Sequence, residues 1–307
     1  MAVISATAFH RGKTLGDDEL HPPQDRCPIC GDGRPRRAVV RLQDDPEVSF
    51  LACGNCSGIS ASRMPTDPAL ADYYANYYDR VATELVTTPR PERLAWLIAD
   101  RFAVNGRPGT VKILDFGGGD GTIALLAAER LIANRTAERV EVLVVDYVRE
   151  NPRALSPDIE LAFAARLEDV GGLFDIVIAS AILEHIPDFR RAFDGLMAHS
   201  APGALFYART PFMTPFGRRV PIDLTYPAHV HDLGAAFWAW LANNAGVPIR
   251  VLEHAPSLVE TVIETHPLRT IAAHVMKTPA RLLAAAGLPA IWPFYGGWQV
   301  IWRIDRS

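Results

Sequence analysis

The stretch from Val111 to Gly121, VKILDFGGGDG, joins a run of apolar residues directly to three regularly spaced glycines. Glycine has no Cβ, so a loop built from it can turn tightly and approach a ligand closely. The residues that follow, TIALLAAERLIA, are typical of a helix, whose first amide groups would point toward such a ligand. The sequence therefore predicts a strand, a glycine loop and a helix that together form a binding site.

The glycine spacing narrows the class of ligand. Gly117, Gly119 and Gly121 follow the pattern G-x-G-x-G, whereas a dinucleotide-binding loop has G-x-G-x-x-G. No Gly-Lys-Ser or Gly-Lys-Thr follows, which excludes a phosphate-binding P-loop. A second apolar run, VEVLVVDY, reaches Asp146, whose carboxylate can accept hydrogen bonds from ribose hydroxyls.

Apolar strands alternate with helical patterns from residue 111 onward. Such alternation favours a parallel sheet that is covered by helices on both faces. We expect a final edge strand in GWQVIWRID, because its apolar residues alternate. The other expected strands are VKILDF, VEVLVVDY, IELAFAA, FDIVIAS, ALFYART and PIRVLEHA.

These motifs resemble those of the class I S-adenosylmethionine-dependent methyltransferases over roughly residues 111–255. Asp115 and the three glycines match the family pattern D-x-G-x-G-x-G, and FDIVIASAILEHIPD matches its fourth-strand region. The resemblance implies a Rossmann-like, seven-stranded, mostly parallel sheet and S-adenosyl-L-methionine as the cofactor. Many family members place an Asp after the third strand, where this chain has Glu168 or Asp169 in AARLEDV. The implied cofactor-binding residues are Asp115, Gly117, Gly118, Gly119, Gly121, Asp146, Tyr147, Glu168 and Ser180.

The chain has four cysteines, arranged in two pairs as Cys27-x-x-Cys30 and Cys53-x-x-Cys56. Such pairs can converge as four thiolates on a structural Zn²⁺, and a hairpin between them, turning at Asp44-Asp45-Pro46, would hold them together. This arrangement looks like a zinc ribbon. Unrelated or disulfide-bonded cysteines are the alternative, and an iron–sulfur cluster is less favoured by the paired spacing. We therefore expect an α/β fold with a small N-terminal zinc ribbon.

We divide the chain into four parts. These are a flexible arm over 1–26, a zinc-ribbon module over 27–60, a linker and helical lid over 61–110, and a methyltransferase domain over 111–307. The last part includes a helical insertion near 257–290. The lid contains Tyr73, Tyr74, Tyr77 and Tyr78 at helical spacing, which fits either core packing or a cover over the cofactor.

Three histidines are the catalytic candidates. His185 follows the fourth strand of the resemblance, and His229 and His231 follow the fifth in a loop long enough to cover a substrate. A histidine titrates near neutral pH and can accept the proton of a methyl acceptor, although each of the three also fits a structural role. Asp223 and Tyr226, in the same loop, are weaker candidates.

Two kinds of methyltransferase with an N-terminal ribbon compete as models. The tyrosine-rich segment and Pro227-Ala228-His229 resemble enzymes of sugar and natural-product biosynthesis. Arg34, Arg36, Arg37 and Arg41 make the ribbon basic, which keeps an rRNA methyltransferase as the alternative, whereas the net charge of −4 disfavours nucleic acid. We predict a small-molecule methyl acceptor. A cofactor-binding protein without catalysis is the second alternative.

The remaining expectations concern location and assembly. No apolar run is long enough to span a membrane, and the N-terminus lacks the pattern of a signal peptide, so we expect a cytoplasmic protein that does not bind membranes. Trp292, Phe294 and Trp298 are expected to serve in packing or in a homodimer contact.

Overall fold

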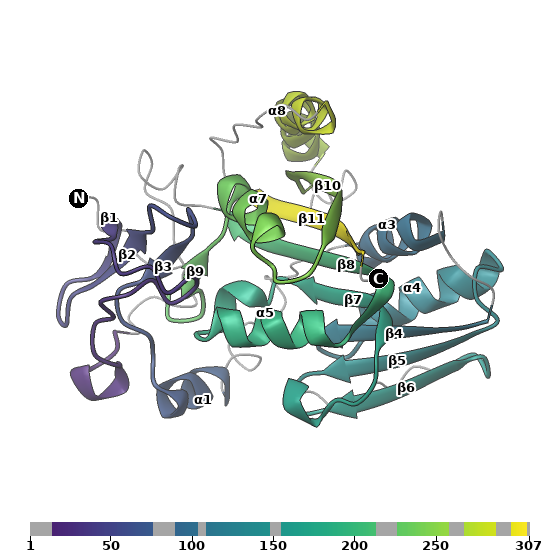
Figure 1. Cartoon of the computed structure of the whole chain (residues 1–307), viewed down its shortest axis with the longest axis horizontal. Coiled ribbons are helices and arrows are strands. Elements are labelled where there is room, and N and C mark those ends of the chain that lie inside the picture. The colour runs from purple at the N-terminus through teal and green to yellow at the C-terminus, as the bar shows by residue number, and fades with distance from the viewer. Residues whose placement is uncertain are drawn as a thin grey trace.

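Figure 1 shows the computed structural model, in which the chain forms a large and a small β-sheet. The structure describes residues 14–75, 90–103, 109–147, 155–212, 226–257, 267–286 and 296–305. The large sheet has seven strands with helices on both faces, and the small sheet has four strands and lies near the N-terminus. The predicted fold class is confirmed.

The seven-stranded sheet has the order β10-β11-β8-β7-β4-β5-β6. Strands β4 to β8 pair in parallel, so the segments that follow them meet at one edge of the sheet. The strands are β4 (Thr110–Phe116), β5 (Arg139–Val145), β6 (Ile159–Ala164), β7 (Phe174–Ser180), β8 (Ser200–Phe212), β10 (Ile249–Pro256) and β11 (Gly296–Ile304).

The last strand does not lie at the edge. β11 lies between β8 and β10 and is antiparallel to both, so the prediction of an edge strand is wrong. Trp298 and Trp302 belong to the apolar core on one face of the sheet, and Ile301 belongs to the core on the other face. The alternation in this segment therefore separates two buried faces of an inner strand.

Helices cover the two faces of the sheet with separate apolar cores. α3 (Pro91–Ala103) and α4 (Thr122–Ala133) pack on one face. α5 (Phe189–Ala198) and α7 (Ala235–Asn243) pack on the other. Figure 1 places α8 (Pro267–Ala285) beside the edge strand β10, where the predicted helical insertion lies.

The small sheet has the order β1-β2-β3-β9. Its strands are β1 (Arg37–Gln43), β2 (Val48–Ala52), β3 (Ile59–Ala61) and β9 (His231–Asp232). β1 and β2 form the predicted antiparallel hairpin. β9 comes from the second half of the chain and pairs with β3 at Ser60↔His231 and Ile59↔Asp232. The ribbon sheet is therefore completed by a strand that is distant in sequence, since Ser60 and His231 are 171 positions apart.

The N-terminal arm differs from the expected loose segment where the structure describes it. Leu15 and Leu20 are buried in the core of the small sheet. The Leu15 backbone exchanges two hydrogen bonds with the side chain of Gln43, and a short 3-10 helix (Asp17–Glu19) follows. Residues 14–26 therefore pack against the ribbon because their leucines extend its small apolar core.

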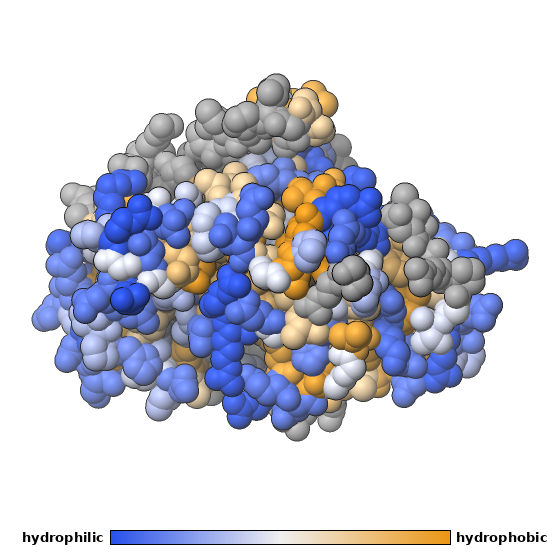
Figure 2. Space-filling model, in the orientation of Figure 1, coloured by the Kyte–Doolittle hydropathy of each residue, from blue (hydrophilic) through white to orange (hydrophobic). Residues whose placement is uncertain are grey.

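Hydrophilic side chains cover much of the surface in Figure 2, and apolar side chains show at the top over α8 as well as in the middle of the view. On α8 the exposed apolar side chains include Leu268, Ile271, Val275 and Leu282. Within the described part of the chain, no helix combines the length and apolar character needed to cross a membrane.

Candidate active site and metal centre

The glycine loop connects β4 to α4 in a conformation that only small residues tolerate. Gly117 has φ of +69°, and a Cβ built on it would lie 2.3 Å from Cγ1 of Ile182. Gly121 caps α4 with φ of +80°, and a Cβ built on it would lie 2.9 Å from Cγ2 of Val144. Because Ile182 lies two residues before Glu184, the glycine loop touches the segment that follows β7.

Asp115, at the end of β4, lies behind this loop. Its side chain is buried, and within the described part of the chain its Oδ2 atom has no hydrogen-bond partner. Burial, together with the nearby Asp146, raises the pKa of Asp115 to about 7. A Cβ on Gly118 would lie 2.4 Å from this carboxyl group, so the backbone can pass over it only as glycine.

Asp146, one residue beyond β5, faces the same loop. Its Oδ2 accepts a hydrogen bond of 2.8 Å from the Gly119 amide, which brings the predicted ribose contact and the glycine loop together. Tyr147 follows and is 88% exposed, and Ser180 is half-buried at the end of β7. The buried carboxyl group of Asp115 lies beside a glycine loop that has no side chains. This arrangement fits a cofactor that carries positive charge.

Glu168 lies on the 3-10 helix Leu167–Asp169 after β6. Its carboxylate forms an ion pair of 2.8 Å with Arg191 on α5 and a longer one of 3.8 Å with Arg166. A hydrogen bond from its own backbone amide, with help from Arg191, lowers the pKa of Glu168. The structure thus directs this carboxylate toward α5, and its contact with adenine stays a prediction.

Three polar side chains meet beside the glycine loop. Glu184 and His185 lie on the 3-10 helix Leu183–His185 directly after β7, and His229 lies shortly before β9. The rings of His185 and His229 are in edge-to-face contact with centroids 4.5 Å apart. The Tyr74 hydroxyl, from α1 (Asp67–Ala75), is 3.0 Å from Nδ1 of His185. Two of the three predicted histidines are therefore brought together at the carboxyl edge of the sheet.

Glu184 is the residue of this cluster that sequence reasoning did not single out. Its carboxyl group is buried, one of its oxygens has no hydrogen-bond partner, and burial raises its pKa to about 8. The positive field of Arg209 opposes this rise in pKa and the negative field of Asp232 adds to it. Its position directly before His185 was the available signal, but the sequence does not indicate that the side chain turns inward.

His231 has a different environment from the other two histidines. Nε2 is 3.0 Å from the carbonyl of Ile186, so it carries the proton and donates it, while Nδ1 is 2.9 Å from the Ser60 hydroxyl. The ring is fully buried, and burial lowers the pKa of His231 to about 4. With both nitrogens engaged, His231 joins the ribbon to the turn after β7 and is not placed to accept a substrate proton, contrary to expectation.

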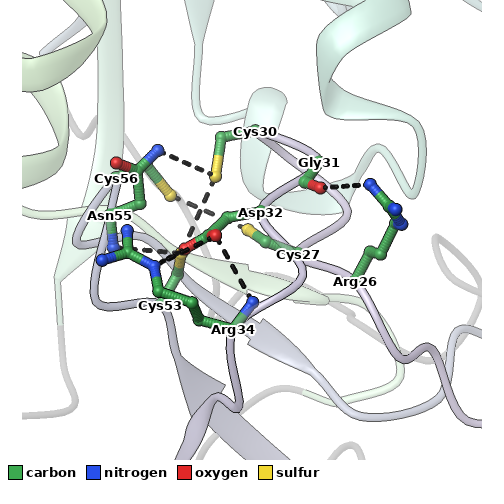
Figure 3. A network of polar contacts seen from close by, with 9 residues as sticks. All are labelled: Arg26, Cys27, Cys30, Gly31, Asp32, Arg34, Cys53, Asn55 and Cys56. Atoms are coloured by element: carbon green, nitrogen blue, oxygen red, sulfur yellow. Dashed lines mark hydrogen bonds and ion pairs between the residues drawn. The ribbon is translucent and has the colours of Figure 1, made fainter.

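The four cysteines converge at the tip of the ribbon (Figure 3). The Sγ atoms of Cys27 and Cys56, and likewise those of Cys30 and Cys53, are 3.7 Å apart. A disulfide needs about 2.05 Å, whereas a tetrahedral zinc site with bonds of about 2.3 Å places its sulfurs about 3.8 Å apart. The four cysteines do not form disulfides, and the spacing of their Sγ atoms fits a tetrahedral metal ion.

Each cysteine pair forms a tight knuckle with the same backbone geometry. The residue after the second cysteine has positive φ in both, at Gly31 (+71°) and at Ser57 (+59°). In each knuckle the amide of that residue donates to the carbonyl of the first cysteine. Asn55 adds a side-chain contact of 3.6 Å to Sγ of Cys30. In the second knuckle this position is not a glycine, and Ser57 adopts the left-handed conformation.

The thiols also influence one another. A hydrogen bond from the Cys56 thiol lowers the pKa of Cys27, and the same contact raises the pKa of Cys56. Burial raises the pKa of Cys53 as well. Burial and the neighbouring thiols therefore oppose the formation of four thiolates, and a cation bound among them would compensate their charge.

The knuckles pack against the large domain. A Cβ on Gly58 would lie 2.9 Å from the side chain of Ile29 and 3.2 Å from the ring of Phe237 on α7. Cys27, Cys53 and Cys56 belong to the same apolar core as α5 and α7. The cysteine cluster is thus part of the interface between the ribbon and the sheet.

The family of the chain follows from a match between residues 74–257 and the model of a family described as a methyltransferase domain. The match covers more than half of the chain and includes the glycine loop, Asp146 and the turn after β7. The chain belongs to this methyltransferase family. It is an S-adenosylmethionine-dependent enzyme of the class that the motifs predicted. No curated protein matches the chain.

Solved structures of similar fold include several methyltransferases. The [4+2]-cyclase SpnF is 18% identical over 70% of this chain and 81% of its own, with a TM-score of 0.45. The plantazolicin methyltransferase BamL is 11% identical over 78% and 92%, with a TM-score of 0.44. An S-adenosylmethionine-dependent methyltransferase from Mesorhizobium loti is 16% identical over 69% and 99%, also with a TM-score of 0.44.

The remaining residues named from the sequence are the tyrosines, Asp223 and the aromatic residues near the C-terminus. Tyr73 is buried, and Tyr226 is buried with its hydroxyl donating to the carbonyl of Arg63 over 3.3 Å. Trp298 is fully buried and contacts the ring of His254, so it serves in packing. The residues that lie outside the described part of the chain are Tyr77, Tyr78, Asp223, Trp292 and Phe294.

Proposed function

We propose that this methyltransferase transfers a methyl group to O, N or C of a small molecule, such as a sugar nucleotide or a natural-product intermediate. The observation that carries the proposal is the cluster of Glu184, His185 and His229 beside the glycine loop. Tyr74 of α1 closes the cluster from the side of the predicted lid through its contact with His185.

The cofactor would be held by the glycine loop, Asp115 and Asp146. S-adenosylmethionine, when bound, supplies a methyl group that is already activated by the positive charge on its sulfur. The chain must then align the acceptor and help to remove its proton, since the nucleophilic atom of an alcohol or carbon acid carries one. His185 and His229 are the histidines at that position, and His231 contacts the turn that carries His185 through the carbonyl of Ile186.

The ribbon arginines do not favour RNA as the acceptor. Arg34 pairs with Asp32 at 2.9 Å, and Arg41 pairs with Asp44 at 3.1 Å and with Glu47 at 3.6 Å. The guanidinium of Arg36 donates to the carbonyl of Gln24. Three of the four arginines that kept nucleic acid open are thus engaged within the chain, and the net charge is −4. Both facts support a small acceptor.

We also propose that the four cysteines hold a structural Zn²⁺. Their spacing of 3.7 Å within each close pair supports this assignment, and all four ligands would be protein atoms, which leaves no open position for catalysis. The ion would fasten the knuckles against α7 and so support the turn that carries His185. Metal analysis of the purified protein is expected to give one zinc per chain.

The function is tested by incubating the protein with S-adenosylmethionine and a panel of sugar nucleotides and natural-product intermediates. We expect S-adenosylhomocysteine to appear by mass spectrometry with at least one acceptor. His229→Ala should lower kcat by roughly 10²- to 10⁴-fold while calorimetry gives unchanged cofactor affinity. His21→Ala, an exposed residue of the ribbon side, is the matched control.

Two outcomes would overturn the proposal. Tight, salt-sensitive binding of RNA at physiological salt would favour the rRNA alternative. Cofactor binding without turnover across the panel would favour a protein that kept the fold and lost catalysis.

A further inference from the structure

The cluster beside the glycine loop has the composition of a metal site. One carboxylate oxygen of Glu184 and one ring nitrogen each of His185 and His229 all lie within 4.8 Å of one another. Among the residues that the structure describes, only the four cysteines form another such group. Two imidazoles and one carboxylate are a ligand set that borderline transition-metal ions accept while keeping coordination positions open.

The distances need little adjustment for a shared ion. Three atoms that each lie about 2.1 Å from one cation are separated by roughly 3–4 Å. Nε2 of His185 is already 3.8 Å from Oε1 of Glu184. Closing the group from separations of up to 4.8 Å requires each ligand atom to move by less than about 1 Å. Such shifts are within the reach of side-chain rotations.

The carboxylate of Glu184 supplies a second, independent reason. Its side chain is only 1% exposed, and its Oε2 atom has no hydrogen-bond partner among the residues that the structure describes. A buried polar atom without a partner is costly, and such atoms call for an explanation such as a missing ion. Arg209 and Asp232 act on this group with opposite charges, so the two together do not provide a clear compensating charge.

Tyr74 gives the cluster the outer contact that metal-binding histidines have. Its hydroxyl lies 3.0 Å from Nδ1 of His185. When Nδ1 carries the proton and donates it to this oxygen, the lone pair of the ring is on Nε2, the nitrogen that faces Glu184. An outer partner of this kind fixes both the tautomer and the orientation of a ligating imidazole.

We propose that Glu184, His185 and His229 bind a divalent transition-metal ion at the carboxyl edge of β7. The ion is distinct from the zinc of the ribbon, because its ligands are nitrogen and oxygen atoms and leave positions open to a substrate. Cation binding is independent of the acceptor, whereas the role of the cation in methyl transfer rests on the proposed function.

That role is to bind the acceptor through oxygen. Coordination lowers the pKa of an acceptor hydroxyl, or of a C–H beside a coordinated carbonyl, and the proton leaves to solvent. The electron pair that remains on the acceptor attacks the methyl carbon, the bond from sulfur to methyl breaks, and sulfur keeps that electron pair. The products are the methylated acceptor, S-adenosylhomocysteine and one proton, and the ion is unchanged.

The test uses the full chain with its ribbon loaded with zinc, titrated with Co²⁺. Thiolates prefer zinc over cobalt, so added Co²⁺ reports on the second site. We expect one Co²⁺ per chain, with the weak visible bands of nitrogen and oxygen ligands and without intense sulfur charge-transfer bands. Glu184→Gln and His229→Gln should each weaken binding at least tenfold, while His21→Gln leaves it unchanged.

A third variant guards against unfolding of the first two. Tyr74 is only partly buried, so Tyr74→Phe should keep the zinc content and the thermal unfolding of the wild type. We expect it to weaken Co²⁺ binding by roughly tenfold through the lost outer contact. The proposal is overturned if Co²⁺ does not bind at millimolar concentration, or if all three variants bind it like the wild type.

The outcomes for the ion and for the function can be told apart. Undiminished methyl transfer without any Co²⁺ binding would reject the ion and keep the proposed function, with the two histidines handling the proton directly. Co²⁺ binding that depends on Glu184 and His229, without turnover of any acceptor, would support the site and reject the proposed function.

Discussion

The central sheet and the ribbon are stabilised in different ways. The sheet is enclosed by two large apolar cores, and its parallel strands are short apolar runs that are close in sequence. The core of the ribbon is small, and it depends on Leu15 and Leu20 from the arm and on Tyr226 and Val230 from far along the chain. The ribbon also carries the four cysteines. The sheet is therefore enclosed by extensive packing of its own, whereas the small ribbon core relies on distant parts of the chain and, under the proposal above, on a bound zinc ion.

The comparison also shows how the two regions are connected. His231 lies in β9 on the ribbon sheet, and its ring spans from Ser60 of β3 to the carbonyl of Ile186 in the turn after β7. The amide of Val230 donates to the carbonyl of Glu184. These contacts connect the ribbon sheet to the turn that positions Glu184 and His185, so a loss of structure in the ribbon should also disturb this turn.

The largest effect is expected when the ribbon loses its ion. Cys27→Ser removes one of four thiolates, and structural zinc contributes roughly 10–16 kcal/mol of apparent binding free energy in small peptides. We expect zinc content to fall and the amides of β1, β2 and β3 to lose protection from hydrogen exchange, while those of β4, β5 and β7 keep it. Methyl transfer should also fall, because His231 loses its partner.

Arg34→Ala is the control for this variant, because its side chain is exposed and, among the described residues, its ion pair is with Asp32. It should keep its zinc and its exchange pattern. An equal loss of protection in both sheets of Cys27→Ser would contradict the difference in stabilisation described above.

The parts of the fold that sequence alone predicted are those encoded by neighbouring residues. Val111–Gly121 places a strand, a loop and a helix start within one short segment, and the two C-x-x-C pairs each define a knuckle. The strand ends at Asp146 and Ser180 follow from apolar runs in the same way. These patterns are local, so they need no knowledge of what packs against them.

The parts that sequence did not predict depend on distant contacts. The alternation of β11 does not tell whether its second face meets solvent or α3, and Ile301 is in fact buried. His229 and His231 are two positions apart and look alike in sequence, yet one faces His185 and the other is enclosed by Ser60 and Ile186. Only the pairing of β9 with β3 separates their roles.

The next effect concerns a buried charge of the central sheet. The pKa of Asp115 is raised to about 7 in the folded chain, so the folded chain holds a proton that the unfolded chain releases above about pH 4. Wild-type stability should therefore fall as the pH rises from about 4 to 7. The Asp115→Asn side chain cannot ionise. Its free energy of unfolding, relative to that of the wild type, should therefore rise by on the order of a few kcal/mol between pH 5 and pH 8.

Denaturant unfolding of both proteins at the two pH values, without cofactor, measures this difference. A gap that is the same at pH 5 and pH 8 would mean that Asp115 is ionised in the folded chain. The core of the sheet would then tolerate a charge without help, and its contrast with the metal-dependent ribbon would be weaker.

A smaller effect is expected in the glycine loop, where two positions with positive φ can be compared. Gly117→Ala adds both backbone strain and a clash with Ile182, whereas Gly119→Ala (φ +60°) adds strain only, since nothing lies within 4 Å of its Cβ. We expect Gly117→Ala to cost roughly 1–3 kcal/mol and Gly119→Ala about 1 kcal/mol of stability. Thermal unfolding measures the stability of each variant, and calorimetry should give weaker cofactor binding for Gly117→Ala. Equal losses would show that packing against Ile182 does not matter.

The smallest effect is expected at Glu168, an exposed residue after β6 that is a predicted cofactor contact. Glu168 and Arg191 form an ion pair of 2.8 Å, but their side chains are 50% and 66% exposed. Such a pair contributes at most about 1 kcal/mol and weakens with salt, so Glu168→Gln should unfold almost like the wild type at high salt. Because its carboxylate is held by α5, we expect cofactor affinity to fall less than threefold. Asp169→Asn is the matched comparison, since either residue can stand where related enzymes have an adenine-binding Asp. A tenfold loss in Glu168→Gln alone would instead identify Glu168 as the adenine contact, and Arg191 as the residue that holds it in place.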